Sequence, residues 1–565
     1  MSIVFDEKLD LFHLVTEHTS YVIGLADKRT YVGHVYYGKR IRPQDMRYLL
    51  RVGEPPYVPS ENNRERCSFY DTFPFEYSGN GVGDYRESAI AVTTVEGQHA
   101  ILPTYVSYEI TKEKPLLAGL PSSFDRDKNA ETLIIHCTDS VLNVNVDLYY
   151  TVFEDTDMIT RSVHICNQDE KPIYLTKALS ACLDMDDNDY EMLTLHGSWA
   201  RERQMDRRAI GYGKTSVGSI KGESSHQEHP FMAWMTKNAT QTTGEVYAMH
   251  FIYSGNFIAQ LEKSQFDSIR AVMGIHPADF GWKLESGDAF DTPEVVLTYS
   301  ADGLGTMTRN FHDFYRNHLI RSKYRNQKRP ILINNWEATY FDFDTEKLLD
   351  IARTAAKHGI EMLVMDDGWF GHRNDDNTSL GDWFVNEEKI TGGLKYLVDE
   401  VNKLGLKFGI WMEPEMISPD SELYKEHPDW AIAVKNRVGT LSRNQYVLDL
   451  SRKEVRDCIY DKIYAILSSA NIEYVKWDMN RQLTDMGSLA LPADQQGELA
   501  HRYVLGVYEL QERLIRDFPE LLLENCSGGG ARFDPGMLYY SPQIWCSDDT
   551  DAIERLGIQE GTSLI

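Results

Sequence analysis

From Pro330 onward the sequence repeats one unit: a short apolar run, a polar loop and an amphipathic helix. Apolar residues at helical spacing, such as Leu394, Leu397, Val398 and Val401, separate several of the runs. The runs lie in the segments ILINNW, EMLVMDD, KFGIWMEPE, EYVKWDMN, LLLENCSGG and QIWCSDD. Strands that alternate with helices indicate a parallel sheet covered by helices. The second half of the chain is therefore expected to be an α/β fold.

The C-terminal ends of these predicted strands carry residues that are unusual for a core: Trp336, Asp366, Asp367, Trp411, Asp478, Cys526 and Asp548. In a (β/α)₈ barrel all such ends meet at one face, which holds the active site. A doubly wound sheet is the alternative, but it would concentrate ligand residues at one switch point. We therefore predict a TIM-type barrel. It is expected to be incomplete at its last two strands, because six strands precede Ile565.

The first 300 residues have a different rhythm, with short alternating runs and no long helical period. Val144, Val146 and Leu148 alternate with Asn145 and Asp147, which places one face of a strand in a core. Many such strands predict a large antiparallel β-sandwich. A stripe of apolar residues at helical spacing follows. We predict a β-sandwich domain at 1–300, a linker helix at 301–328 and a partial catalytic barrel at 329–565.

Composition argues against several classes of protein. The 58 Lys and Arg residues stand against 86 Asp and Glu, a formal net charge of −28, and such a field repels nucleic acid. The N-terminus does not resemble a secretory signal, and no apolar stretch reaches the roughly 18 residues of a membrane span. The seven cysteines contain no C-x-x-C pair, so no disulfide framework is expected. A cytoplasmic protein is predicted, without nucleic-acid or membrane partners.

The segment KWDMNR is the strongest candidate for chemistry. Alternate residues of a strand share a face, so Lys476, Asp478 and Asn480 would project together into the barrel mouth. The Lys476 cation should hold the carboxylate ionised, as an anionic nucleophile requires. The alternative is a structural Lys/Asp pair at the barrel rim.

The segment CSDDTD places three acids within four positions at another strand end. Crowded carboxylates raise one another's pKa, and a protonated acid is what a departing oxygen needs. The competing interpretation is an acidic helix N-terminus, which we favour for Asp551. For Asp548 we favour the catalytic interpretation, because Asp478 is expected to face it across the barrel.

Asp366 and Asp367, next to Trp369, suit a sugar, because carboxylates bind hydroxyl groups while an aromatic ring stacks on the apolar face. A metal site that also uses Glu413 or Glu415 is the competing interpretation. No HExxH or EF-hand spacing supports it, and we expect neither metal nor cofactor. The glycine run 528–530 lacks the lysine of a phosphate loop, which favours close backbone approach to a neutral ligand.

Several segments in their order resemble the bacterial α-galactosidases of glycoside hydrolase family 36: LHGSWARER, INNWEATYFDF, MDDGWFG, GIWMEPEM, YVKWDMNR, ENCSGGGARFDPGML and WCSDDTDAIERL. The resemblance implies an N-terminal β-supersandwich, a linker helix, a (β/α)₈ barrel and a small C-terminal β domain. This chain departs from the family after its sixth barrel strand.

The resemblance also implies roles for single residues. Asp478 corresponds to the nucleophile and Asp548 to the acid/base. Trp199 corresponds to the position where the N-terminal domain reaches an active site, which could belong to a neighbouring subunit. A sugar-binding set is implied at Trp336, Asp366, Asp367, Trp411, Arg443, Lys476, Asn480, Cys526 and Gly529.

The expected activity is retaining hydrolysis of terminal α-D-galactosyl groups, as in melibiose or raffinose, with the two carboxyl groups about 5 to 5.5 Å apart. A homo-oligomer, specifically a tetramer, is implied. The alternatives are a raffinose-synthase-like galactosyl transferase, a metal-dependent phosphohydrolase and an inactive sugar-binding protein.

Overall fold

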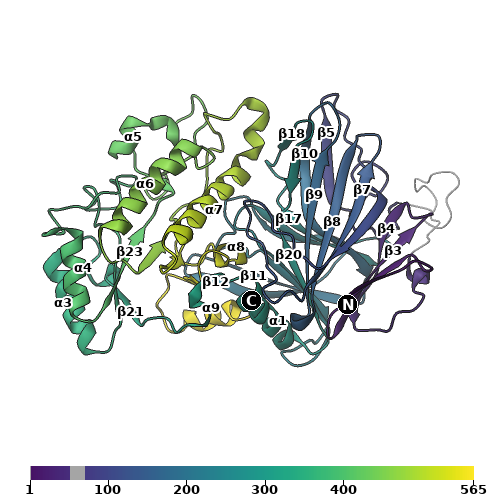
Figure 1. Ribbon diagram of the computed structural model, residues 1–565, viewed down its shortest axis with the longest axis horizontal. Coiled ribbons are helices and arrows are strands. Elements are labelled where there is room, and N and C mark those ends of the chain that lie inside the picture. The colour runs from purple at the N-terminus through teal and green to yellow at the C-terminus, as the bar shows by residue number, and fades with distance from the viewer. Residues whose placement is uncertain (1, 51–69) are drawn as a thin grey trace.

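The computed structural model describes residues 2–50 and 70–565. The chain forms two bodies that lie side by side (Figure 1): a β-sandwich, purple to teal, and an α/β body, green to yellow. Cys67 lies outside the described residues, and the other six cysteines are free thiols. None of the described helices is both long and apolar enough to cross a bilayer.

The sandwich is built from three antiparallel sheets. The first contains β1 (Ile3–Asp6), β2 (Leu11–Val15), β3 (Thr19–Ala26) and β4 (Tyr31–Lys39). The second has the order β13 (Gly213–Ser219), β16 (Phe257–Lys263), β17 (Ser268–Ile275), β10 (Ile173–Asp186) and β18 (Trp282–Leu284), with β5 (Ile90–Thr94) paired to β10. The third has the order β12 (Arg201–Ala209), β11 (Tyr190–Ser198), β14 (Phe231–Thr236), β15 (Val246–Phe251), β20 (Val295–Ser300), β9 (Met158–Asn167), β8 (Val144–Phe153), β7 (Glu131–Asp139) and β6 (Thr104–Thr111), with β19 (Ala289–Asp291) paired to β9.

The alternation predicted in β8 defines the core of the third sheet. Val144, Val146, Leu148 and Tyr150 are buried, whereas Asn145 between them is exposed. Such alternation is typical of a strand with one face in a hydrophobic core and one face in water. The expected antiparallel sandwich is confirmed.

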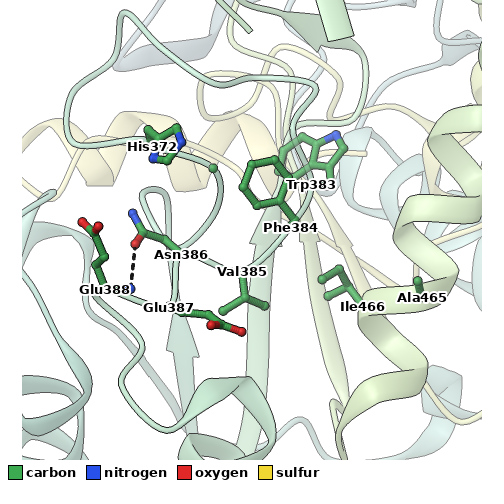
Figure 2. A pocket seen from close by; sticks show the side chains of 10 residues that line it. His372, Trp383, Phe384, Val385, Asn386, Glu387, Glu388, Ala465 and Ile466 are labelled. Atoms are coloured by element: carbon green, nitrogen blue, oxygen red, sulfur yellow. Dashed lines mark hydrogen bonds between the residues drawn. The ribbon is translucent and has the colours of Figure 1, made fainter. Parts of the chain in front are cut away.

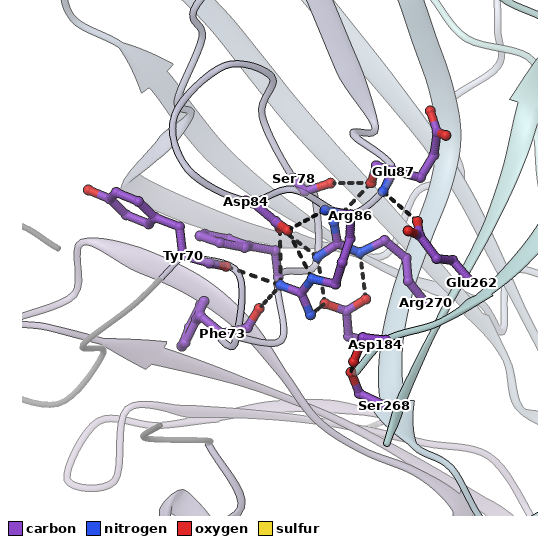
Figure 3. A network of polar contacts seen from close by, with 12 residues as sticks. Tyr70, Phe73, Ser78, Asp84, Arg86, Glu87, Asp184, Glu262, Ser268 and Arg270 are labelled. Carbon is purple, nitrogen blue, oxygen red and sulfur yellow. Dashed lines mark hydrogen bonds and ion pairs between the residues drawn. The ribbon is translucent and has the colours of Figure 1, made fainter. Parts of the chain in front are cut away.

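A network of buried charges ties the loop before β5 to β10 and β17 (Figure 3). Arg86 pairs with Asp84 at 2.9 Å and with Asp184 at 3.1 Å. Arg270 pairs with the same two carboxylates at 2.8 and 2.7 Å. All four side chains are buried. Because two cations meet two anions, this ionic quartet has no net charge.

Helix α1 (Leu304–His318) follows the sandwich. Its predicted apolar stripe, which includes Met307, Phe311 and Phe314, is buried in a cluster with sandwich residues and with the C-terminal Leu564 and Ile565. The short 3₁₀ helices among the described residues are η1 (Arg47–Leu49), η2 (Glu154–Thr156), η3 (Lys323–Asn326), η4 (Pro428–Trp430) and η5 (Ala493–Glu498).

The α/β body contains a parallel six-stranded sheet in chain order: β21 (Leu332–Asn334), β22 (Met362–Met365), β23 (Lys407–Met412), β26 (Tyr474–Trp477), β27 (Leu522–Asn525) and β28 (Gln543–Ile544). A ribbon of β24 (Met416–Ile417) and β25 (Tyr446–Val447) follows the third strand. Its helices are α2 (Trp336–Thr339), α3 (Thr345–Lys357), α4 (Gly393–Lys403), α5 (Glu422–Glu426), α6 (Lys453–Ser469), α7 (Leu499–Asp517), α8 (Pro535–Leu538) and α9 (Glu554–Thr562).

The strand order decides between the two α/β folds that the sequence left open. A doubly wound sheet reverses its order at a switch point, whereas barrel strands follow one another in sequence. The six strands are consecutive neighbours throughout, so the doubly wound alternative is wrong. The six parallel strands have the sequential order predicted for a TIM-type barrel, and their C-terminal ends form the site described next.

Candidate active site

Three carboxylates lie where β22, β26 and β28 end. Asp366 and Asp478 directly follow their strands, and Asp548 lies four residues after β28. The Lys476 ammonium lies 3.3 Å from Asp366 Oδ2 and also interacts electrostatically with Asp478 and Asp548. The structure therefore brings together the residues that the strand ends predicted.

Both carboxylate oxygens of Asp478 accept hydrogen bonds. Trp411 Nε1 and Asn480 Nδ2 donate to Oδ2 at 3.0 and 2.9 Å. The backbone amides of Met479 and Gly528 donate to Oδ1 at 2.9 and 3.3 Å. A buried carboxylate with this many donors is fixed in orientation and is stabilised in its ionised form.

The pKa of Asp478 lies below its ordinary value. Burial alone would raise that pKa, but the Lys476 cation and the hydrogen bonds from Trp411, Asn480 and Cys526 more than compensate for it. Asp478 is thus an anion at neutral pH, which is the state of a nucleophile.

Asp548 has the opposite electrostatic character. Burial and the neighbouring Asp478 anion raise its pKa, against the opposing effects of Lys476 and two tryptophans. Those tryptophans are Trp545, whose Nε1 donates to Oδ1 at 3.0 Å, and Trp199, whose Nε1 donates to Oδ2 at 3.2 Å. Two nearby carboxyl groups with divergent pKa values are what a nucleophile and a general acid require.

Trp199 reaches this site from the sandwich, at the turn between β11 and β12. The contact joins residues 349 positions apart in one chain. The Trp199 side chain is 62% exposed, so most of its ring is free to touch a ligand next to Asp548. By contrast, Asp551 accepts hydrogen bonds from the amides of Ile553 and Glu554 at the start of α9, which agrees with the structural interpretation favoured for it.

Asp366 and Asp367 make different contacts although they are adjacent. Asp366 Oδ2 accepts from Asn334 Nδ2 at 2.5 Å and from Lys476. Arg373 donates to both oxygens of Asp367, from Nε to Oδ1 at 2.5 Å and from Nη2 to Oδ2 at 2.7 Å. Burial nevertheless raises the pKa of Asp367, because it outweighs the opposing effect of Arg373. Each carboxylate keeps lone pairs that can accept from further hydroxyl groups.

The predicted tryptophans divide into two kinds. Trp411 is only 2% exposed, and its ring N–H donates to Asp478, so it orients that carboxylate. Trp336 begins the short helix α2, is partly exposed, and packs edge-on against Tyr340 and Phe341. It remains available as an aromatic platform.

Arg443 is exposed at the tip of a tight turn, with φ values of 49° at Arg443 and 61° at Asn444. Positive φ is costly for residues other than glycine and is often found at functional sites. The Arg443 charge lowers the pKa of Asp367 and of Glu413, although burial raises both more strongly. Arg443 therefore lies at the acidic mouth of the barrel.

Cys526 and Gly529 follow β27. Cys526 is buried, and burial raises the pKa of its thiol, which is therefore neutral. Gly529 has φ +88°, and a Cβ there would lie 2.8 Å from the backbone nitrogen of Asp548. Only glycine fits this close approach between two strand ends.

Glu413, considered from the sequence only as a metal ligand, is part of this site. Its carboxylate accepts from the Asn480 backbone amide at 2.5 Å, from Asn480 Nδ2 at 3.1 Å and from Gln445 Nε2 at 2.7 Å. Burial and the Asp478 anion raise its pKa to about 7. The acidic end of GIWMEPE was the available signal, but the sequence did not indicate Asn480 as its partner. Within residues 2–50 and 70–565, no three His, Cys, Asp or Glu side chains are grouped as metal ligands would be.

A separate cavity of about 620 Å³ lies between the loop after β22 and helix α6 (Figure 2). His372, Phe384 and Glu387 line it on the loop side, and Ala465 and Ile466 line it on the helix side. It contains none of the carboxylates at the strand ends.

Two family descriptions match this chain: Glycosyl hydrolase family 36 N-terminal domain over residues 30–285 and Melibiase over residues 289–565. The chain is 48% identical to alpha-galactosidase AgaA of Geobacillus stearothermophilus, over 100% of this chain and 78% of AgaA. It is 46% identical to alpha-galactosidase Mel36A of Lactobacillus acidophilus, over 100% of this chain and 77% of Mel36A.

Solved structures of similar proteins share the fold. The alpha-galactosidase AgaB of Geobacillus stearothermophilus superimposes with a TM-score of 0.97 at 47% identity, over 100% of this chain and 78% of AgaB. A substituted form of AgaA in complex with raffinose has a TM-score of 0.96 at 48% identity, over 98% and 77% of the two chains. Another, in complex with stachyose, has a TM-score of 0.96 at 47% identity, with the same coverage.

Proposed function

The chain belongs to glycosyl hydrolase family 36 and is an α-galactosidase that hydrolyses galacto-oligosaccharides, and we propose that it works by double displacement with Asp478 as nucleophile and Asp548 as acid/base. The observation that carries the assignment is the opposite character of the two carboxyl groups. The pKa of Asp478 is lowered by a cation and three side-chain donors, and the pKa of Asp548 is raised by burial and by Asp478.

The reaction has two steps. Asp478 attacks the anomeric carbon and forms a covalent β-galactosyl enzyme, while Asp548 gives its proton to the departing glycosidic oxygen. Asp548, now an anion, then takes a proton from water, which attacks the same carbon and releases galactose from Asp478. Two inversions give net retention, so α-galactose is the first product.

Recognition of galactose is assigned to the acids and aromatic rings around this pair. Asp366 and Asp367 are proposed to accept from the sugar hydroxyls O4 and O6, with Trp336 and Trp199 against its apolar edges. A glucose-configured substrate would leave a buried carboxylate without its partner, which costs about 1 to 3 kcal/mol or more. Lys476, Arg443, Asn480, Cys526 and Gly529 complete the proposed sugar-binding set with Trp411.

The experiment that tests the mechanism follows an aryl α-galactoside by NMR from the first turnover. Retention predicts that α-galactose appears first and that the β-anomer grows in only by mutarotation. If β-galactose is the first product, Asp478 does not act as a nucleophile. If aryl α-glucosides and α-galactosides turn over at equal rates, the assignment of the Asp366 and Asp367 contacts is wrong.

The homo-oligomer implied by the family remains a proposal. The Trp199 to Asp548 contact is made within one chain, so a monomer should keep it. Light scattering of the protein over a concentration series gives the assembly state.

A further inference from the structure

The turn that follows β27 lies between the proposed nucleophile and the sandwich. Ser527 Oγ lies 2.6 Å from Glu223 Oε2, although the two residues are 304 positions apart. Glu223 belongs to the sandwich, in the loop after β13. We propose that Glu223 is a positioning residue for the nucleophile and that it acts as a neutral carboxylic acid. This inference rests on the proposed role of Asp478.

Ser527 controls the backbone groups that hold one oxygen of Asp478. Asp478 Oδ1 accepts from two amides, those of Met479 and Gly528. Ser527 Oγ is within 2.9 Å of the Met479 carbonyl oxygen, and Ser527 directly precedes Gly528. A shift of Ser527 therefore moves both donors of Oδ1. The donors of Oδ2 are the side chains of Trp411 in β23 and of Asn480, which follows β26.

Counting protons at Ser527 favours a neutral Glu223. A serine hydroxyl has one hydrogen to donate, whereas the Glu223 and Met479 oxygens are two acceptors at hydrogen-bonding distance. Two separate hydrogen bonds form if Glu223 Oε2 carries a proton and donates it to Ser527 Oγ, whereas an ionised Glu223 would have to share the single Ser527 hydrogen with the Met479 carbonyl oxygen. With Glu223 protonated, Ser527 donates to Met479. The other oxygen, Glu223 Oε1, accepts from Gln482 Nε2 at 3.1 Å, as the carbonyl oxygen of a neutral acid can.

The surroundings of Glu223 agree with a neutral acid. It is 1% exposed, and burial raises its pKa despite the opposing effects of the Ser527 hydrogen bond, the His226 and Arg532 charges and the Gln482 hydrogen bond. Arg532 is already paired with Glu415 at 2.7 Å. The other titratable groups that interact with Glu223 are Lys221 and Tyr503.

His226, also from the sandwich, makes a second hydrogen bond to the same turn. Its Nε2 donates to the Gly528 carbonyl oxygen at 2.6 Å. The sandwich therefore holds the turn on both sides of the peptide that donates to Asp478. In this way the sandwich, which lies outside the barrel, helps to fix the orientation of the Asp478 carboxylate.

The first test uses four variants of the whole chain assayed on an aryl α-galactoside. Glu223→Gln keeps a neutral donor to Ser527, so kcat should stay within about twofold. Glu223→Ala and Ser527→Ala free the turn, and kcat should fall about tenfold or more with a smaller change in KM, because small misplacements of reacting groups are costly. Glu294→Gln is the matched control, since Glu294 is a buried glutamate of the sandwich that accepts from Ser123 and pairs with Lys114, away from the loop of Glu223. It should keep its kcat even if its melting temperature falls.

Wild-type kcat in both Glu223→Ala and Ser527→Ala would overturn the positioning role. An equal loss in Glu223→Gln and Glu223→Ala would overturn the neutral state. Crystal structures of the alanine variants provide a readout that needs no turnover. The Gly528 amide should have moved away from Asp478 Oδ1, and an unmoved amide contradicts the inference.

The second test measures thermal unfolding of wild type and Glu223→Gln across pH. A carboxyl whose pKa is higher in the folded than in the unfolded chain binds its proton more tightly when folded, so wild-type stability falls relative to Glu223→Gln as pH rises above the unfolded pKa. The difference should grow from about pH 4.5 upward. A difference that stays constant with pH contradicts the neutral acid. This result is independent of activity, so an inactive wild type would count against the proposed function and not against Glu223.

Discussion

Two groups of buried charged residues in this protein differ in their balance of positive and negative charge. The ionic quartet of Arg86, Asp84, Asp184 and Arg270 matches two cations with two anions (Figure 3). In the group at the strand ends the Lys476 cation interacts with three acids, Asp366, Asp478 and Asp548, and Glu413 adds a further acid beside Asp478.

The difference appears in the direction of the pKa values. In the quartet, Arg270 and Arg86 overcome burial and lower the pKa of Asp184, so its charged form is favoured. At the strand ends Lys476 acts on several acids at once, and the pKa of Asp478 falls while those of Asp548 and Glu413 rise. Balanced burial of charge gives a fixed structure. Unbalanced burial leaves a proton that can be transferred, and the two groups should respond differently to mutation.

The largest effect is expected for Asp478→Asn, which removes the proposed nucleophile but keeps its shape. We expect kcat on an aryl α-galactoside to fall by about 10⁴, or roughly 5.5 kcal/mol of transition-state stabilisation. Stability at neutral pH should fall modestly, because the lowered pKa of Asp478 means that the folded state favours its charged form. The measurements are steady-state kinetics and the melting temperature. Activity within tenfold of wild type would rule out the assignment.

The corresponding change in the quartet, Asp184→Ala, should have the reverse outcome. It leaves two buried arginines facing one carboxylate, and breaking such a pair costs about 3 to 5 kcal/mol of unfolding free energy. The kcat per folded molecule should be unchanged, since the quartet lies wholly within the sandwich. Denaturant unfolding and active-site-normalised rates test this. A kcat that falls without loss of stability would show that the quartet acts on catalysis.

Lys476→Met sharpens the comparison by removing the cation that interacts with Asp366, Asp478 and Asp548. Lys476 lowers the pKa of both Asp478 and Asp548, so both values should rise without it. Asp478 must be ionised and Asp548 protonated, so both limbs of the kcat/KM profile should move to higher pH, by about one unit, or roughly 1.4 kcal/mol. An unchanged pH profile would mean that Lys476 does not tune either group.

Whether a residue of this site could be predicted from the sequence depends on what positions it in the structure. Asp366, Lys476, Asp478 and Asp548 could be predicted because parallel strands bring their C-terminal ends to one face. The roles of their neighbours were less predictable. Trp411 was expected against the sugar, but its N–H donates to Asp478, and no pattern in the strand indicates which atom a buried ring will meet.

The contacts between the sandwich and the α/β body were the hardest to predict from the sequence. Glu223 reaches Ser527 across more than 300 positions, and neither periodicity nor spacing encodes which sandwich loop meets which barrel turn. Trp199 was placed at an active site only through the family resemblance. Its hydrogen bond to Asp548 depends on how the sandwich packs on the barrel, and the residue pattern does not determine that packing.

The smallest effect is expected for Trp199→Phe, which keeps an aromatic ring and removes one N–H donor to Asp548. That donor lowers the pKa of Asp548, so the alkaline limb of the profile should move slightly upward. The donor is exposed to water, which replaces it in part, so kcat should change by only about two- to fivefold. The matched control is Phe384→Ala, which removes a 45% exposed aromatic ring from the separate cavity and should leave the profile unchanged. If Phe384→Ala shifts the alkaline limb as much as Trp199→Phe does, the shift does not arise from the hydrogen bond to Asp548.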